Sequence, residues 1–309
     1  MSRPKLLPVF FAAAACLSAQ QPPAPPAPPA PPEAPAAPRP PAPPEMPAFT
    51  PTRTEHRVEV LGYNGKLWVT NRNGSIKVEG WNQERVDFTA YIRDSEGRHI
   101  DLKVERKDGG LAIEAVWPQS GWFNFGFFGS QSPRCEFVLK VPYKVISNYA
   151  TTNGGIEVKG VEGFAGCDTT NGDIRVSNIK GEVHADTTNG SIVASELFAR
   201  IKGGTTNGDL DLTNVAGGID LDTTNGSITA KNLDGWGEGI RLESTNGEIE
   251  VELGQAKGDL HAENSNGRLD IKLSGVEIVN MEKHEAQIRI PGRAQKLSFE
   301  TTNGGIVVR

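Results

Sequence analysis

The chain has 309 residues, 37% of them hydrophobic, and a formal net charge of −6. This length suits one large β domain or two ordinary domains. A mildly acidic chain lacks the clustered basic charge that nucleic-acid binding requires, so we expect no nucleic-acid partner.

Residues 1–19 are predicted to be a secretory signal peptide. Arg3 and Lys5 precede a mostly apolar run, and Leu17-Ser18-Ala19 offers a small-residue cleavage site. The apolar run is too short to span a bilayer, so we expect no transmembrane segment in the mature chain. Ala13-Ala14-Ala15-Cys16 resembles a bacterial lipoprotein cleavage box that lacks its usual leucine, so a lipid-anchored envelope protein stays an alternative. We expect an exported protein of the periplasm or cell surface.

Residues 20–52 are predicted to be a Pro/Ala-rich disordered linker. Between positions 22 and 51, 16 of the 30 residues are proline, mostly in Pro-Pro-Ala triplets. Such a segment prefers the polyproline II conformation and has no side chains that could form a core. It would act as a semi-rigid spacer, at about 3.1 Å per residue, or as an unanchored tail.

Residues 53–150 are predicted to be N-terminal cap strands. Apolar and polar residues alternate in short runs that Asn-Gly or Asp-Gly pairs separate, which is typical of β-strands and turns. The expected strands cover residues 56–60, 66–70, 75–79, 85–92, 100–105, 111–116 and 136–141. No stretch shows a sustained helical period, so we expect very little helix.

Residues 151–309 are predicted to form regular Asn-Gly repeats. The pair recurs every 18 residues from Asn153-Gly154 to Asn225-Gly226, and again at Asn246, Asn266 and Asn303. Each repeat divides into two halves with alternating apolar residues. The pattern predicts an all-β fold, a β-solenoid or β-helix-like stack of short strands with two strands per 18-residue coil.

Four apolar columns and two polar ladders follow from this stacking. Ile156, Ile174 and their equivalents should point inward, and the asparagine amides should form one ladder along the stack and the preceding threonine hydroxyls another. Gly and Asn are expected in the turns because they tolerate positive φ best. The repeated motif is therefore interpreted as structural. The last strand, Val307-Val308-Arg309, would either form an edge or pair back onto the body.

The motifs resemble the adhesin-like β-strand-repeat domain of bacterial envelope proteins, a domain of unknown function. The resemblance rests on Asn73-Gly74-Ser75-Ile76, on Lys140-Val141-Pro142 running into Thr151-Thr152-Asn153-Gly154, and on the series of Asn-Gly-x-Ile/Leu strands. It spans roughly residues 54–309. It implies an exported β-repeat domain and supplies no catalytic residues.

Two features break the repeat or carry reactive groups. An aromatic segment is a candidate contact loop or a hydrophobic cap over an open end of the stack; its members are Trp117, Trp122, Phe123, Phe125, Phe127 and Phe128. Cys135 and Cys167 both have inward parity in predicted strands, so they are a candidate disulfide or two buried thiols.

We looked for catalytic and metal-binding patterns and predict no catalytic residue, no cofactor and no metal site. A calcium β-roll would need an aspartate column, but Asp173 and Asp209 alternate with serines at that place in the repeat. Asp168, Asp186 and Asp222 form a spaced acidic column, in which like charges would raise the pKa values. Neither a nucleophile triad nor a phosphate loop can be assembled.

The sequence thus favours a non-enzymatic protein with a binding or scaffolding, adhesin-like role in the cell envelope, whose partner would be an envelope protein or a glycan. A polysaccharide-active β-helix enzyme is the alternative, and it would need carboxylates that converge in a groove. Local function is expected where the repeat fails: residues 117–128, the insertion around Trp236, and residues 281–291.

Overall fold

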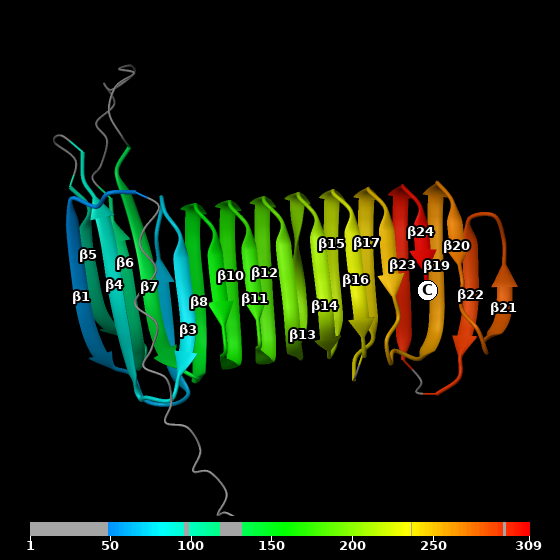
Figure 1. The fold of residues 1–309 in the computed structure, drawn as a ribbon, viewed down its shortest axis with the longest axis horizontal. Coiled ribbons are helices and arrows are strands. Elements are labelled where there is room, and N and C mark those ends of the chain that lie inside the picture. The colour runs from blue at the N-terminus through cyan, green and yellow to red at the C-terminus, as the bar shows by residue number, and fades with distance from the viewer. Residues whose placement is uncertain (1–48, 96–98, 118–131, 236, 293–294) are drawn as a thin grey trace, which may run out of the picture. The chain divides into compact units, whose positions relative to one another are not determined.

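The structure, a computed structural model, describes residues 49–95, 99–117, 132–235, 237–292 and 295–309. Within these ranges there are 24 strands and no helix. The predicted all-β class is therefore confirmed. The strands form a stack of coils in which each coil adds one strand to each of two faces (Figure 1).

In the regular coils, the first face holds the strands that follow the Asn-Gly turns. In stack order it consists of β1 (Arg53–Val60), β4 (Arg85–Arg93), β7 (Arg134–Pro142), β3 (Ile76–Trp81), β9 (Ile156–Lys159), β11 (Ile174–Ser177), the first part of β13 (Ile192–Asn207), β14 (Leu210–Ala216), β16 (Ile228–Leu233), β18 (Ile249–Glu252), β24 (Ile306–Val308) and β20 (Leu269–Ile271).

In the regular coils, the second face holds the strands that lead into the Asn-Gly turns. In stack order it consists of β5 (Asp101–Lys107), β6 (Gly110–Val116), β2 (Gly65–Thr70), β8 (Lys144–Asn153), β10 (Glu162–Asn171), β12 (Lys180–Asn189), the last part of β13, β15 (Ile219–Asn225), β17 (Ile240–Asn246), β23 (Lys296–Asn303), β19 (Gly258–Asn266), β22 (Glu285–Ile290) and β21 (Glu277–Met281).

Two strands per coil are confirmed, but the two halves of the repeat are unequal. β11 has four residues and β12 has ten, because the long strand continues through both threonines to the asparagine. Each strand pairs in parallel with the same strand of the next coil, as Ile174 with Ile192 and Val183 with Ile201. The 18-residue interval therefore keeps every apolar side chain in line with its equivalent.

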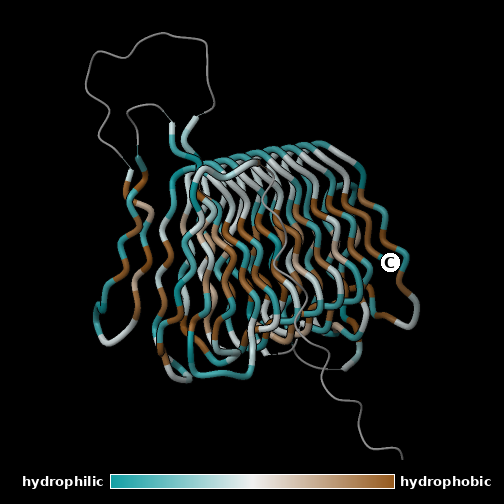
Figure 2. The backbone as a smooth tube through the Cα atoms, turned by 60° about the vertical axis from the view of Figure 1, so that its left-hand side comes forward, coloured by the Kyte–Doolittle hydropathy of each residue, from teal (hydrophilic) through white to brown (hydrophobic). Residues whose placement is uncertain are grey.

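The predicted apolar columns form the core. The side chains of the first column are at most 1% exposed from Ile156 to Ile228, and Ala165, Val183, Ile201, Ile219 and Ile240 form an equally buried column on the second face. Figure 2 shows these residues as hydrophobic bands that run from coil to coil. The small side chains at Ala165, Ala185 and Ala194 fit the narrow space between the faces.

The predicted asparagine ladder is confirmed. Each asparagine after the first donates its Nδ2 to the Oδ1 of the preceding one at 2.8–3.1 Å, in the stack order Asn153, Asn171, Asn189, Asn207, Asn225, Asn246, Asn303 and Asn266. The amides are exposed, and each satisfies its neighbour along the edge of the stack.

The hydroxyl ladder is built differently from our expectation. Thr169 Oγ1 donates to the Gly154 carbonyl at 3.0 Å, and Thr187, Thr205 and Thr223 repeat this bond to the glycine carbonyl 15 residues earlier. The hydroxyls thus bond backbone rather than one another, because the glycine carbonyl of the neighbouring coil points at them and would otherwise lack a partner.

Positive φ was the wrong reason for the Asn-Gly pairs of the regular repeat, although Asn64 and Gly74 in the N-terminal pairs do have it. Neither Asn171 nor Gly172 has positive φ; that conformation lies at the other turn of the coil, at Gly160, Asn178, Glu196, Asn214 and Asn232. Glycine is needed after the asparagine because a Cβ on Gly190 would lie 2.0 Å from the carbonyl oxygen of Gly172 in the neighbouring coil. Close approach of stacked backbones therefore selects the glycine.

The N-terminal strands both extend the stack and cap it. β2 and β3 form a regular coil beside β8 and β9, and Asn73 bridges to Asn153. β6 and β7 lie outside that coil although they follow it in sequence. β1, β4 and β5 are antiparallel strands that end the stack on this side.

The C-terminal strands insert into the stack instead of ending it. β23 lies between β17 and β19, and β24 lies between β18 and β20 (Figure 1). The last strand is therefore paired on both sides. The end of the stack is made by the β21–β22 hairpin, which is the only part of the described chain that lies beyond β19.

Candidate functional site

A groove crosses the second face beside the turns of positive φ. It has a volume of about 730 Å³. It is lined by the first residues of β10 and β12, by the middle of β13 and by the turn between β14 and β15. Gly237 and Glu238 of the insertion complete the lining. Neighbouring coils are about 4.8 Å apart, so the four steps from Glu162 to Glu238 make the groove roughly 19 Å long. Its volume lies within the range of small-molecule binding sites.

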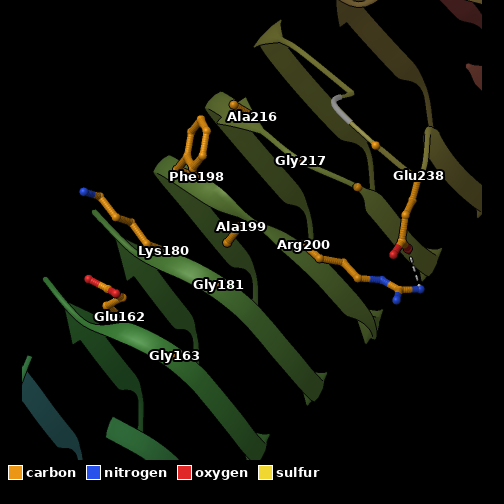
Figure 3. A pocket seen from close by; sticks show the side chains of 12 residues that line it. Glu162, Gly163, Lys180, Gly181, Phe198, Ala199, Arg200, Ala216, Gly217 and Glu238 are labelled. Atoms are coloured by element: carbon orange, nitrogen blue, oxygen red, sulfur yellow. Dashed lines mark ion pairs between the residues drawn. The ribbon is translucent and has the colours of Figure 1, made fainter. Parts of the chain in front are cut away.

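Among the described residues, one exposed aromatic side chain, that of Phe198, lines this groove. Glu162, Lys180, Phe198 and Ala216 occupy the same place in successive coils, so they form one row across the groove. Figure 3 shows Lys180 and Phe198 projecting from neighbouring strands. Phe198 is 57% exposed, while Ala199 beside it is 3% exposed. The ring therefore presents apolar surface to solvent above a closely packed base.

Small residues make the base of the groove flat. The position after the row carries Gly163, Gly181, Ala199 and Gly217. The three glycines have φ between +117° and +145°, and a Cβ on any of them would lie 2.1–2.4 Å from a carbonyl oxygen of the neighbouring coil. No larger side chain fits the three glycine positions, so a ligand in the groove would lie directly on backbone.

The charges around the groove are balanced but not all paired. Arg200 Nη2 lies 2.8 Å from Glu238 Oε2 (Figure 3). Lys144 Nζ lies 3.6 Å from Glu162 Oε1. Lys180 is exposed and forms no ion pair with any residue that the structure describes. It is the cation beside Phe198 that remains available to a ligand.

The acidic column lies on the same face, further along the strands. Asp168 and Asp186 are register partners, and Gly204 separates them from Asp222. Removal of water by the neighbouring strands raises the pKa of Asp186, and repulsion from Asp168 raises it further. The pKa of Asp168 is also raised by loss of water, whereas nearby His184 lowers it. Loss of water, rather than like charge, is thus the larger cause.

This shift predicts a pH-dependent gain in stability on replacing Asp186 by Asn. Because the folded-state pKa of Asp186 is raised, the folded protein binds the proton more tightly, and stability falls as pH rises from the unfolded pKa through the folded one. D186N should therefore be more stable than the parent chain at pH 7, and the difference should vanish at a pH below both values. Urea unfolding midpoints at the two pH values test this, with D211N on the first face as the control. Equal midpoints of D186N and parent at pH 7 would contradict the assignment.

The two cysteines are buried thiols and do not pair. Both side chains are fully buried and free. Cys135 lies in β7 on the first face and Cys167 in β10 on the second face, three coils along the stack. This separation, roughly 14 Å, exceeds the distance that a disulfide can bridge. Burial raises the pKa of Cys135 to about 12, so it is a poor nucleophile at neutral pH.

The predicted contact loop falls mostly outside the described residues. This applies to Trp122, Phe123, Phe125, Phe127 and Phe128. Trp117, at the end of β6, is half-buried and packs against the core. Its indole N–H is buried and has no hydrogen-bond partner among the described residues.

Sequence reasoning did not find the groove, although it indicated one of its walls. The insertion around Trp236 was singled out because it breaks the repeat, and Gly237 and Glu238 line the groove. Phe198 was missed because it occupies a repeat position where lysine, glutamate and alanine also occur. The sequence does contain a signal for it: Phe198 is an aromatic residue at a repeat position where the charged residues of other coils indicate that the side chain faces solvent.

Metal-binding clusters and membrane-spanning helices are both absent from the part of the chain that the structure describes. They contain no group of three or more His, Cys, Asp or Glu side chains arranged to hold a metal ion. They also contain no helix that is long and apolar enough to cross a membrane.

Comparison with known proteins places this fold in a family. Residues 66–309 match the family model described as Toastrack DUF4097. This confirms the resemblance to an adhesin-like β-strand-repeat domain of unknown function. No curated protein matches the chain.

Solved structures with a similar fold come from several bacteria. They include a "putative cell adhesion protein" from Clostridium sporogenes (14% identity, TM-score 0.28, 83% of this chain and 99% of that chain covered) and a "putative adhesin" from Bacteroides fragilis (9%, 0.43, 84% and 99%). A "putative lipid binding protein" from Parabacteroides distasonis is also similar (12%, 0.41, 84% and 97%). At these identities and TM-scores the likenesses do not bear on function.

Proposed function

This chain belongs to the Toastrack DUF4097 family, and from that premise we propose that it is an exported, non-enzymatic β-repeat protein with a binding role in the bacterial cell envelope. The stack supplies a rigid scaffold, and the groove on its second face supplies the binding site. The predicted signal peptide and the Pro/Ala-rich linker support export and display away from the N-terminus.

The exposed ring of Phe198 is the observation that carries this proposal. The side chain of Phe198 is 57% exposed on a strand of a well-packed stack, so a large apolar surface stays in contact with water. The lysine and alanine at the same position of the neighbouring coils expose no comparable apolar surface. A flat base, a cation at Lys180 and a length of four coils suit an extended ligand that stacks on the ring. We propose a glycan chain of the envelope as this ligand.

The carboxylates support a binding role over hydrolysis. Glycoside hydrolysis needs two carboxyl groups that face each other across the scissile bond. Glu162 and Glu238 line opposite ends of the groove, and each is held by a cation, Lys144 and Arg200 respectively. The carboxyl groups with raised pKa values are those of Asp168, Asp186 and Glu243, and none of them lines the groove.

A glycan array tests the proposal. The parent chain should bind a subset of extended glycans, and F198S should lose at least about tenfold in affinity for them, because stacking on the ring contributes of the order of 1 kcal/mol or more. K180S should weaken binding of the anionic members of that subset only. I146S is the matched control, since Ile146 is a partly exposed apolar residue of β8 outside the groove.

Two results would contradict the proposed role. Binding that survives in F198S would show that the groove is not the site. Release of new reducing ends from a bound glycan would show that the protein is a polysaccharide-active enzyme. The mass of the mature N-terminus separately decides the lipid-anchored alternative, since a chain that begins at Gln20 cannot be acylated at Cys16.

A further inference from the structure

Every Asn-Gly turn of the asparagine ladder contains two groups that can react with each other. The backbone nitrogen of the glycine can attack Cγ of the asparagine, because glycine has no side chain to block the approach. The N–H proton is lost to water, the new C–N bond closes a succinimide ring, and Nδ2 takes up a proton and leaves as ammonia. Water then opens the ring at either carbonyl to give aspartate or isoaspartate, so the reaction needs no oxidant and no cofactor.

The stack restrains this reaction through the coil that follows each turn. In stack order, the glycine N–H donates to the asparagine carbonyl of the next coil at 2.9–3.2 Å; the donors are Gly154, Gly172, Gly190, Gly208, Gly247 and Gly304. The asparagine Oδ1 accepts a second bond, from Nδ2 of the next rung. A nitrogen that donates into the stack must break its bond before it can attack, and an amide held on both sides must break another before it can turn.

The last rung of the ladder lacks both restraints. Asn266 is last in stack order, and the turn that it begins joins β19 to β20 (Figure 1). Among the described residues, Gly267 N–H has no acceptor and Asn266 Oδ1 has no donor. A single bond holds the amide, from Asn266 Nδ2 to Asn303 Oδ1, and at 3.1 Å it is the longest bond of the ladder.

The β21–β22 hairpin stops short of this turn. Pairing of β22 with β19 ends at Glu263, and Asn264 N–H donates to the His284 carbonyl at 2.9 Å. No backbone hydrogen bond from the described part of the hairpin reaches Gly267. Gly267 is also exposed, whereas the glycine after every other asparagine of the ladder is partly buried. A terminal rung with one neighbour opens more easily than a rung inside the stack, and water reaches it directly.

We propose that Asn266 is a deamidation site of this chain and that it converts to isoaspartate and aspartate before any other rung of the ladder. The product carries a carboxylate, which cannot donate to Asn303 Oδ1, so the ladder becomes one rung shorter. Asn225 is the intermediate case. Gly226 N–H also has no acceptor among the described residues, but the amide of Asn225 is held by both of its neighbours at 2.9 Å. Asn225 should therefore convert after Asn266 and ahead of the other rungs.

Ageing of the purified full chain in mildly alkaline buffer tests the proposal. Peptide mass spectrometry should show the amide-to-acid mass increase at Asn266 at least about tenfold faster than at Asn189, because two hydrogen bonds that restrain Asn189 are absent at Asn266. The same incubation in urea is the control. There both residues are unrestrained Asn-Gly pairs, so their rates should be similar.

Two replacements test the cause of the difference. N303S removes the one ladder bond of Asn266 and should speed its conversion several-fold. N153S removes a rung at the far end of the ladder and should leave the rate at Asn266 unchanged. Both replaced side chains are exposed, so each variant should keep the parent unfolding midpoint.

Three results would overturn the proposal. The first is another ladder asparagine that converts before Asn266. The second is an Asn266 that stays intact in the folded chain while the urea sample converts. The third is an N303S chain in which Asn266 converts no faster than in the parent. None of these results depends on the groove, so the glycan-binding role is tested separately.

Discussion

I192D is expected to abolish folding of the stack. Ile192 is 1% exposed and lies in the first apolar column, between Ile174 and Leu210. A carboxylate there would enter a space that holds no described polar partner, so it would have to lose its water or disrupt the coil. We expect a loss of more than about 4 kcal/mol in the free energy of unfolding, which is comparable with the whole stability of many domains. Circular dichroism and urea unfolding measure the effect.

The neighbouring residue supplies the control for this replacement. The side chain of Val193 points to the outer side of the same strand, between Arg175 and Asp211. V193D should change the unfolding midpoint little, since its charge stays in solvent and meets one neighbour of each sign. A soluble I192D with the parent midpoint would show that the column does not face inward.

G190A is expected to be nearly as damaging, although it adds a single methyl group at an edge of the stack. The new Cβ would lie 2.0 Å from the Gly172 carbonyl oxygen, which is backbone and is fixed by its own bond to Thr187 Oγ1. The coil spacing or the hydrogen bonds must give way, so we expect a loss of about 2–4 kcal/mol. Thermal unfolding of the purified variant measures it.

Gly155 gives a matched control one residue further along an equivalent turn. A Cβ there would meet its nearest atom, the Asp173 carbonyl oxygen, at 3.1 Å, and other coils carry aspartate or serine at this position. G155S should therefore shift the thermal midpoint far less than G190A. Equal shifts would show that loss of glycine flexibility, rather than contact between coils, explains the Asn-Gly pairs.

Coil geometry was accessible from the sequence because it depends on short-range patterns. Alternation every two residues assigns each side chain of Ile174–Ser177 to the core or to solvent, and the 18-residue interval then aligns coils. The asparagine ladder follows from the same interval. The reason for the glycine was misread, since a turn that needs positive φ and a turn that needs close approach both select Gly.

Sequence alone determined the class of fold, the core columns and the structural role of the Asn-Gly repeat in this protein. Only the tertiary structure decided the order of the coils, the groove and the unlike ends. The motif at Asn303 could pair equally well beside Asn246 or Asn266, and it lies between them. Rungs of one repeat have nearly the same edges, so local pattern leaves their order open. The exposure of Phe198 and Ile278 could not be predicted for the same reason. Whether a side chain is exposed depends on which coil lies beside it, and the order of the coils determines that neighbour.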